Sequence, residues 1–232
     1  MIHDWNTPIL KRLLGMRDAL PHALLLHGPE GVGKAALARR FAAALLCEAP
    51  LPDGDACGRC PACGWFAQSN HPDFRLLAPE ADEEPADGSK ATGKGEGGKT
   101  KASRDIRIQQ VRALGEFLSV GAHRAGRKLV LVCPADALNT PAANALLKTL
   151  EEPPGDTVFL LVTGHADALP ATIRSRCVAV EVPLPAPQAA LAWLGSLPGI
   201  DPAAASGAPS RSAPASCSPG TALSPPPPTS TS

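Results

Sequence analysis

Five short apolar runs alternate along the chain with segments of helical periodicity, and this alternation is the feature that most restricts the fold. The runs lie at residues 23–27, 74–77, 129–133, 158–163 and 178–182. Parallel strands buried on both faces have near-continuous apolar sequences, and each parallel crossover usually contains a helix. The sequence therefore predicts an α/β fold, with a five-stranded parallel sheet flanked by helices.

Helices are predicted between these strands from apolar spacing and from capping residues. Two sets of apolar side chains recur at helical spacing, namely Leu37, Phe41 and Leu45, and Val111, Leu114 and Leu118 within residues 108–119. Thr140 and Pro141 predict an N-cap followed by proline at the first helical position. The helix that they open is expected over residues 142–152, because two consecutive prolines follow it.

Two segments have compositions that do not suit a packed core. Residues 80–104 carry six acidic and five basic side chains and no apolar residue larger than alanine, which predicts a flexible surface insertion. Residues 201–232 consist almost entirely of Ala, Ser, Pro, Gly and Thr, which predicts a disordered tail. The remaining length provides one full domain and excludes two large ones.

Charge and hydropathy restrict the partners. Lys+Arg and Asp+Glu each number 22, so no net cationic field attracts the chain to DNA or to anionic lipid. Any role with nucleic acid must be local or shared with partner proteins. The sequence has no uncharged apolar window of about 18 residues, the minimum for a membrane span, and its first residues lack a signal-peptide pattern. We expect a soluble cytoplasmic protein without a membrane partner.

A phosphate-binding loop is predicted between the first strand and the helix after it. Gly28, Gly31, Gly33 and Lys34 provide the glycines and the lysine of such a loop in the strand-to-helix context that it requires. Backbone N–H groups would converge on phosphate oxygens, and Lys34 would reach the β and γ phosphates. The next position, where a hydroxyl would hold Mg²⁺, is Ala35. We expect no Mg²⁺ site; ATP binding is left open, and the alternative is a glycine-rich turn with no ligand.

Hydrolysis of a nucleotide would also need acidic residues at the end of a neighbouring strand, to hold the metal and orient water. The strand at residues 129–132 is followed instead by Cys133 and Pro134, and the nearest acid, Asp136, lies in the turn beyond. Because the hydroxyl and both acids are missing, the sequence predicts that this chain is not a hydrolase.

Four cysteines are grouped in the pattern Cys-x9-Cys-x2-Cys-x2-Cys, over residues 47–63. They are Cys47, Cys57, Cys60 and Cys63. Four thiolates at such spacing can complete a tetrahedral zinc shell, so we predict a zinc module here. The alternatives are a redox pair or buried free thiols.

Two further motifs complete a pattern that resembles a known family. Residues 144–154 have the sequence Asn-Ala-Leu-Leu-Lys-Thr-Leu-Glu-Glu-Pro-Pro, and Ser175, Arg176 and Cys177 form a triplet. With the loop and the four cysteines, these motifs resemble the bacterial DNA polymerase III clamp-loader subunits of the AAA+ superfamily, over residues from about 5 to 183. The resemblance implies a P-loop-type AAA+ fold, with residues 1–183 as an ATPase-like domain.

The resemblance also bears on the C-terminal part. Clamp-loader subunits continue into a small helical lid and then a helical collar domain. Residues 184–200 contain one helical pattern that would begin such a lid. The collar has no counterpart in this sequence, so the C-terminus is expected to be truncated or altered.

Ala35, Cys133 and Pro134 make the chain similar to the delta-prime branch of that family, whose members do not hydrolyse ATP. This implies a stator that helps to load the sliding clamp onto primed DNA, with gamma/tau-like and delta-like subunits as its direct partners. It also implies that Arg176 acts in trans on the ATP of a neighbouring subunit. The alternative for Arg176 is a surface arginine that pairs locally.

Two other functions compete with the stator. A motor subunit that hydrolyses ATP is favoured by the glycine loop and opposed by Ala35, Cys133 and Pro134. A zinc-dependent DNA-binding module is opposed by the zero net charge and by the lack of aromatic residues interleaved with basic ones.

Overall fold

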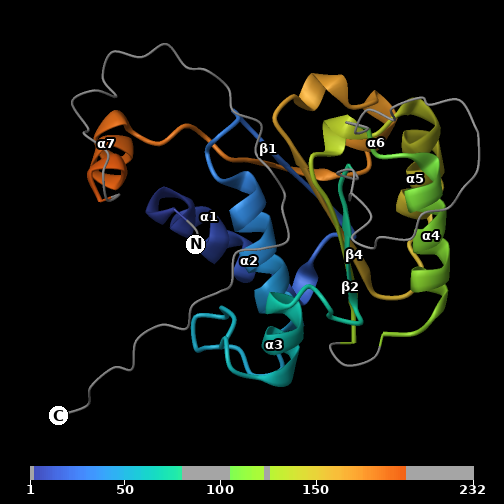
Figure 1. The fold of residues 1–232 in the computed structure, drawn as a ribbon, viewed down its shortest axis with the longest axis horizontal. Helices are drawn as coiled ribbons and strands as arrows, with labels where there is room; N and C mark the ends of the chain where they lie inside the picture. Colours follow the sequence, from blue (N-terminus) through green and yellow to red (C-terminus); the bar gives the residue numbers. More distant parts are fainter. Residues whose placement is uncertain (1–2, 80–104, 123–125, 197–232) are drawn as a thin grey trace, which may run out of the picture.

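The computed structural model describes residues 3–79, 105–122 and 126–196. Its centre is a five-stranded sheet in the order β2-β3-β4-β1-β5, and every neighbouring pair is parallel (Figure 1). The strands are β1 (Ala23–His27), β2 (Phe74–Leu77), β3 (Lys128–Val132), β4 (Thr157–Thr163) and β5 (Val178–Glu181). The predicted α/β fold with five parallel strands is confirmed, and the strand bounds differ from the predicted ones by one residue at most.

Helices fill the connections between the strands. The α-helices are α1 (Thr7–Leu14), α2 (Lys34–Leu46), α3 (Pro61–Ala67), α4 (Ile108–Ser119), α5 (Thr140–Glu151), α6 (Ala171–Arg174) and α7 (Pro187–Gly195). Short 3₁₀ turns are η1 (Asp4–Asn6), η2 (Arg17–Ala19), η3 (Ala135–Ala137) and η4 (Ala166–Ala168). Among the described residues, no helix is long and apolar enough to cross a membrane.

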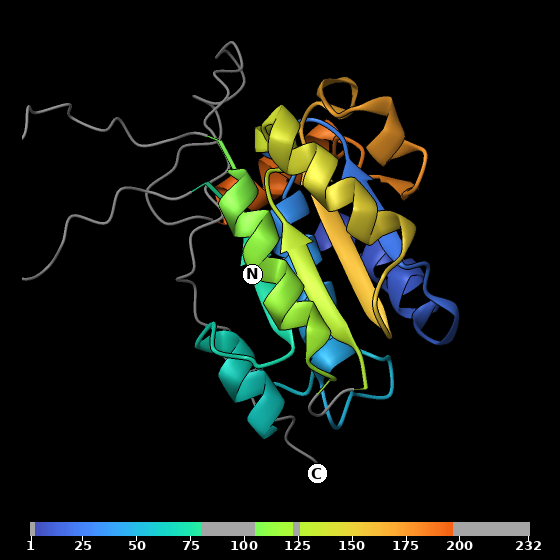
Figure 2. The same cartoon turned by 90° about the vertical axis from the view of Figure 1, so that its right-hand side faces the viewer.

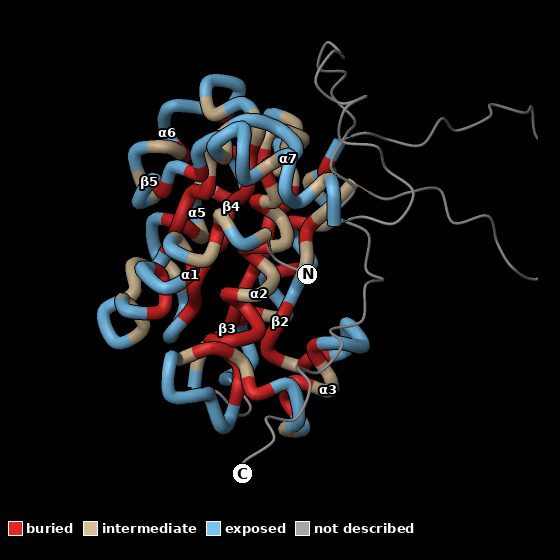
Figure 3. Tube along the Cα trace, turned by 90° about the vertical axis from the view of Figure 1, so that its left-hand side faces the viewer, coloured by how far each residue is buried: buried red, intermediate tan, exposed pale blue. Residues whose placement is uncertain are grey.

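The sheet separates two hydrophobic cores. Because side chains alternate along a strand, Leu24 and Leu26 of β1 join the core with α1 and α2, whereas Ala23 and Leu25 join the core with α4 and α5. Figures 1 and 2 show these two helical layers on opposite faces of the sheet. Every residue of β3 and β4 is buried, and these central strands form the buried interior in Figure 3.

The start of α5 differs from its prediction. The N-cap is Asn139 rather than Thr140: its backbone is extended, and its side-chain oxygen accepts a hydrogen bond from the N–H of Ala142 at 2.9 Å. Thr140 is the first helical residue, so Pro141 stands second. The helix ends at Glu151, one residue earlier than predicted, and the two prolines follow its C-cap, Glu152.

Three other predictions concern segments near or beyond the described parts. The insertion at residues 80–104 and the tail at residues 201–232 lie outside them. Helix α7 falls within residues 184–200, where the start of a lid was predicted, and its function as a lid stays a prediction.

We predict that Asn139→Ala lowers the free energy of unfolding by about 1 kcal/mol, because it leaves the N–H of Ala142 without its acceptor. The measurement is chemical denaturation of the purified chain. Thr140→Ala is the matched control and should change stability by a few tenths of that value. A larger loss for Thr140→Ala than for Asn139→Ala would contradict the cap assignment.

Candidate functional site

The phosphate-type loop joins the interior strand β1 to helix α2. Gly28, Gly31 and Gly33 all have positive φ, at 147°, 80° and 89°, a region that other residues rarely adopt. At Gly28 the need for glycine is also steric, because a Cβ would lie 2.1 Å from the carbonyl oxygen of Val182, just after β5. The loop is therefore pressed against the end of β5, and Gly33 is the N-cap of α2.

Lys34 is folded back onto its own loop. Its Nζ donates to the carbonyl oxygens of Gly28 at 2.7 Å and Pro29 at 2.5 Å, and the residue is buried. Burial lowers the pKa of Lys34, and the carboxylates of Glu30 and Asp136 oppose that shift. The sequence predicted that this ammonium group would reach phosphate. In the structure it donates to two carbonyl oxygens of the loop instead.

One acid from outside the loop stands at the carboxyl edge of the sheet. Asp136 lies in η3, and its Oδ1 accepts a hydrogen bond of 2.6 Å from the Thr163 hydroxyl at the end of β4. Cys133, which follows β3, is buried, and Ala35 lies in the first turn of α2. Ala35, Cys133 and Pro134, which stand where a hydroxyl and two acids would be needed, therefore offer none of these groups.

The N-terminal segment covers the loop, which the sequence did not predict. Trp5 Nε1 and Asn6 Nδ2 both donate to the carbonyl oxygen of Val32, at 3.1 and 2.8 Å. His3 stacks on Trp5 with ring centroids 4.4 Å apart, and Trp193 of α7 meets both rings edge-on. An aromatic cluster thus links the loop, the N-terminal segment and α7.

The four cysteines converge between α2 and α3. The sulfur atoms of Cys47, Cys57, Cys60 and Cys63 all lie within 4.8 Å of one another, and those of Cys47 and Cys60 are 3.9 Å apart. Four sulfurs around one zinc ion, each at about 2.3 Å, would be separated by about 3.8 Å. The donor set and its spacing therefore fit a tetrahedral metal ion.

Local backbone structure holds the sulfurs in place. Cys47 caps the C-terminus of α2, and Cys60 is the N-cap of α3, its sulfur accepting from the N–H of Cys63. A hydrogen bond from the backbone N–H of Arg59 is the largest cause that lowers the pKa of the Cys57 thiol, to about 6, whereas burial raises that of Cys63. Donors directed at sulfur favour thiolates, the form that binds metal.

An ion pair ties the cysteine cluster to α2. Nε and Nη2 of Arg40 both donate to Oδ2 of the buried Asp55, at 2.8 and 2.5 Å. Because Arg40 belongs to the helix that starts at the glycine loop, the cysteine cluster and the loop are attached to the two ends of one rigid element.

Arg176 lies just after α6, at the surface. Its Nη2 donates to Oε1 of Glu151 at 2.5 Å and its Nη1 to the carbonyl oxygen of Thr172 at 2.9 Å. The side chain keeps 35% of its exposure. In the described parts of the chain, its contacts are with α5 and α6 and with Ser175, none of which belongs to the glycine loop.

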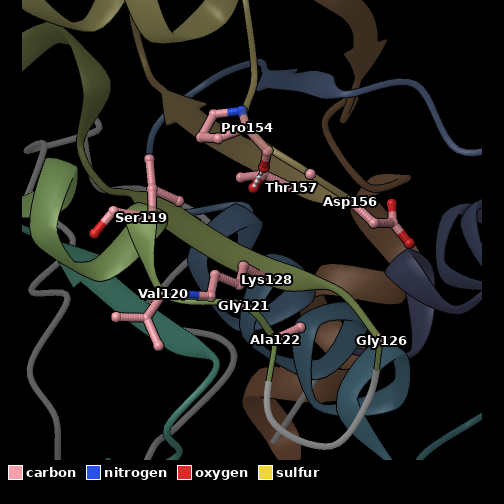
Figure 4. A pocket seen from close by; sticks show the side chains of 11 residues that line it. Ser119, Val120, Gly121, Ala122, Gly126, Lys128, Pro154, Asp156 and Thr157 are labelled. Carbon is pink, nitrogen blue, oxygen red and sulfur yellow. Dashed lines mark hydrogen bonds between the residues drawn. The ribbon is translucent and has the colours of Figure 1, made fainter.

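A pocket of about 280 Å³ lies away from these groups, between the end of α4 and the starts of β3 and β4. Figure 4 shows Lys128 among its lining residues. The Lys128 ammonium donates to the carbonyl oxygen of Phe117 and lies 4.4 Å from the centre of that ring. None of the predicted site residues of the glycine loop or the cysteine cluster lines this pocket, nor does Arg176.

A parallel sheet in the order β2-β3-β4-β1-β5, with a glycine loop between β1 and helix α2, defines a P-loop-type α/β domain. The fold is similar to that of a gamma subunit-related DNA polymerase III protein from Thermotoga maritima, with a TM-score of 0.51 and 21% identity, over 81% of this chain and 50% of that one.

Sequence comparison then defines the family. The sequence model described as "DNA polymerase III, delta subunit" matches residues 8–185, so the chain belongs to that family. It is 44% identical over 204 residues to DNA polymerase III subunit delta' of Pseudomonas aeruginosa, which covers 88% of this chain and 56% of the relative. It is 35% identical over 194 residues to DNA polymerase III subunit delta' of Escherichia coli, a match that covers 83% of this chain and 52% of the relative. The chain thus spans about half the length of these curated relatives.

Proposed function

We propose that this chain is a non-hydrolysing stator subunit of a DNA polymerase III clamp loader and that Arg176 acts on the ATP held by a neighbouring subunit. The observation that carries the proposal is a surface guanidinium on a domain whose own glycine loop lacks the groups for hydrolysis. Arginine suits this task, since its planar fork can pair with phosphate oxygens in two places.

The proposed partners follow from the same assignment. Gamma/tau-like and delta-like subunits would contact the chain directly, and the sliding clamp and primed DNA would be reached through the complex. Residues 1–183 would form the ATPase-like domain, and α7, within residues 184–200, would begin a lid that the aromatic cluster holds against the N-terminal segment.

Within this function the cysteine cluster would hold one Zn²⁺ through Cys47, Cys57, Cys60 and Cys63. A closed shell of four sulfurs is typical of structural zinc, which stabilises a fold and carries out no reaction. The metal would fix the segment between α2 and α3, which has a helix of only seven residues.

We predict one Zn²⁺ per purified chain and its loss in Cys60→Ser, because three sulfurs leave the shell incomplete. Elemental analysis gives the stoichiometry, and thermal denaturation gives the accompanying loss of stability. Cys177→Ser is the matched control, since Cys177 lies outside the cluster, and it should keep full metal content. Purified wild-type chain that contains no zinc and two disulfides among these cysteines would contradict the assignment.

A second prediction concerns nucleotide turnover by the isolated chain. It should show no ATPase activity above background, and Lys34→Ala should leave that rate unchanged, because Ala35, Cys133 and Pro134 supply no metal ligand. The measurement is phosphate release at saturating Mg-ATP. A turnover of about 1 per second that Lys34→Ala abolishes would indicate a motor subunit instead.

The experiment that tests the function uses Arg176 in the assembled complex. Arg176→Ala should lower kcat at the adjoining ATP site by roughly 10³-fold, as expected for loss of an arginine that stabilises transferred phosphate. Arg176→Lys should restore only part of the rate, since an ammonium lacks the planar fork. The measurement is clamp- and DNA-stimulated ATP hydrolysis, together with clamp loading.

Arg174→Ala is the matched control for this experiment. Arg174 ends α6, is 39% exposed, and pairs with Asp167 at 2.9 Å, so its removal also takes one arginine from the same surface. Both variants must assemble and keep their zinc. Normal hydrolysis and clamp loading by an assembled Arg176→Ala complex would refute the trans role.

A further inference from the structure

The guanidinium of Arg176 is held at two points by its own chain. Glu151 at the end of α5 binds Nη2, and the Thr172 carbonyl oxygen in α6 binds Nη1. A guanidinium has five N–H donors in one plane, so these two bonds fix its plane and leave further donors on the same fork. An arginine fixed in this way loses less conformational freedom when it meets a phosphate than one that swings freely.

The place of Glu151 is not explained by helix stability. It is the last residue of α5, where the helix dipole disfavours a carboxylate and favours a cation. Lys148 already places a positive charge in the last turn, and Arg176 adds a second from outside the helix, 25 positions along the chain. Both side chains are part exposed, at 35% and 49%, and ion pairs of this kind contribute little to folding.

The elements that carry the pair are themselves anchored. Leu150, the neighbour of Glu151, is buried in the same core as Ile173 of α6. The carboxylate therefore projects from a fixed helix end, and the carbonyl of Thr172 belongs to the turn that packs against it. The position of the guanidinium follows from these packed elements.

We infer that Glu151 is a positioning residue for Arg176, which orients the guanidinium toward the phosphate of a neighbouring subunit. The inference rests on the proposed function, because it requires that Arg176 acts in trans. Glu151 contacts no nucleotide in this arrangement: it acts only through the arginine.

The test uses an assembled clamp loader in which only the motor subunit that adjoins this chain retains a working ATP site. Glu151→Ala should lower kcat at that site by about two- to fivefold, the range that corresponds to a part-exposed ion pair, with KM for ATP unchanged. Glu151→Gln keeps an oxygen acceptor and should recover part of the rate. Glu152→Ala is the matched control, as it removes the adjacent exposed carboxylate, and should match the wild type.

A double variant separates positioning from a structural effect. If Glu151 acts through the arginine, Glu151→Ala should add no loss of kcat to Arg176→Ala, and the melting temperature of the single variant should stay close to that of the wild type. A full additional loss in the double variant would overturn the inference. So would a faster rate in Glu151→Ala, which would make Glu151 a competitor of the phosphate.

The same measurements distinguish the two levels of the proposal. If the Arg176→Ala complex is impaired and the Glu151→Ala complex is normal, the positioning role of Glu151 is refuted and the trans role of Arg176 stands. If the Arg176→Ala complex is normal, both the trans role of Arg176 and the positioning role of Glu151 are refuted.

Discussion

The parallel pairing of β1 with β4 on one side and β5 on the other is the constraint on which the rest of the structure depends. Parallel strands end at the same edge, so the residues that follow them are brought together. Gly28 follows β1, Thr163 ends β4, and Val182 follows β5. Because β3 pairs with β4, Asp136, which follows β3, lies at the same edge. Its carboxylate accepts a hydrogen bond from the Thr163 hydroxyl. Residues from four strand ends therefore meet at one edge of the sheet, beside the glycine loop.

Local sequence carried enough information to predict the sheet, the loop and the cysteine cluster. Each depends on residues close together in the chain: a continuous apolar run, glycines at fixed offsets, or four cysteines within one short segment. The N-cap of α5 shows the limit of such patterns, since Asn139 and Thr140 both suit a cap, and the backbone angles decide between them. The hydrogen bonds of Trp5 and Asn6 to Val32 join residues 27 and 26 positions apart, and no local sequence pattern predicts them.

The described contacts join regions that appear independent in the sequence. Helix α2 begins at the glycine loop and ends at Cys47, and Arg40 on the same helix binds Asp55 beside the cysteines. A zinc ion at this place would therefore stabilise the far end of the helix that supports the loop. At the other end, the aromatic cluster attaches α7 to the N-terminal segment that covers the loop. The N-terminal segment thus contacts the loop directly, whereas α7 is linked to the loop through that segment and the cysteine cluster through α2.

These contacts suit a loop that keeps one conformation. A motor loop has to release its lysine to phosphate and to rearrange as nucleotide binds and leaves, whereas here Lys34 bonds the carbonyls of Gly28 and Pro29. If Lys34 turned toward a nucleotide, it would lose these two hydrogen bonds, and contacts with phosphate would have to replace them. Because the site lacks Mg²⁺ ligands, the free energy gained from binding the phosphate would be small. Under the proposed function, the domain would change little in shape during the ATP cycle of its neighbours. A subunit that presents one arginine in a fixed position would require such rigidity, and the proposed role of Glu151 would extend it to the guanidinium itself.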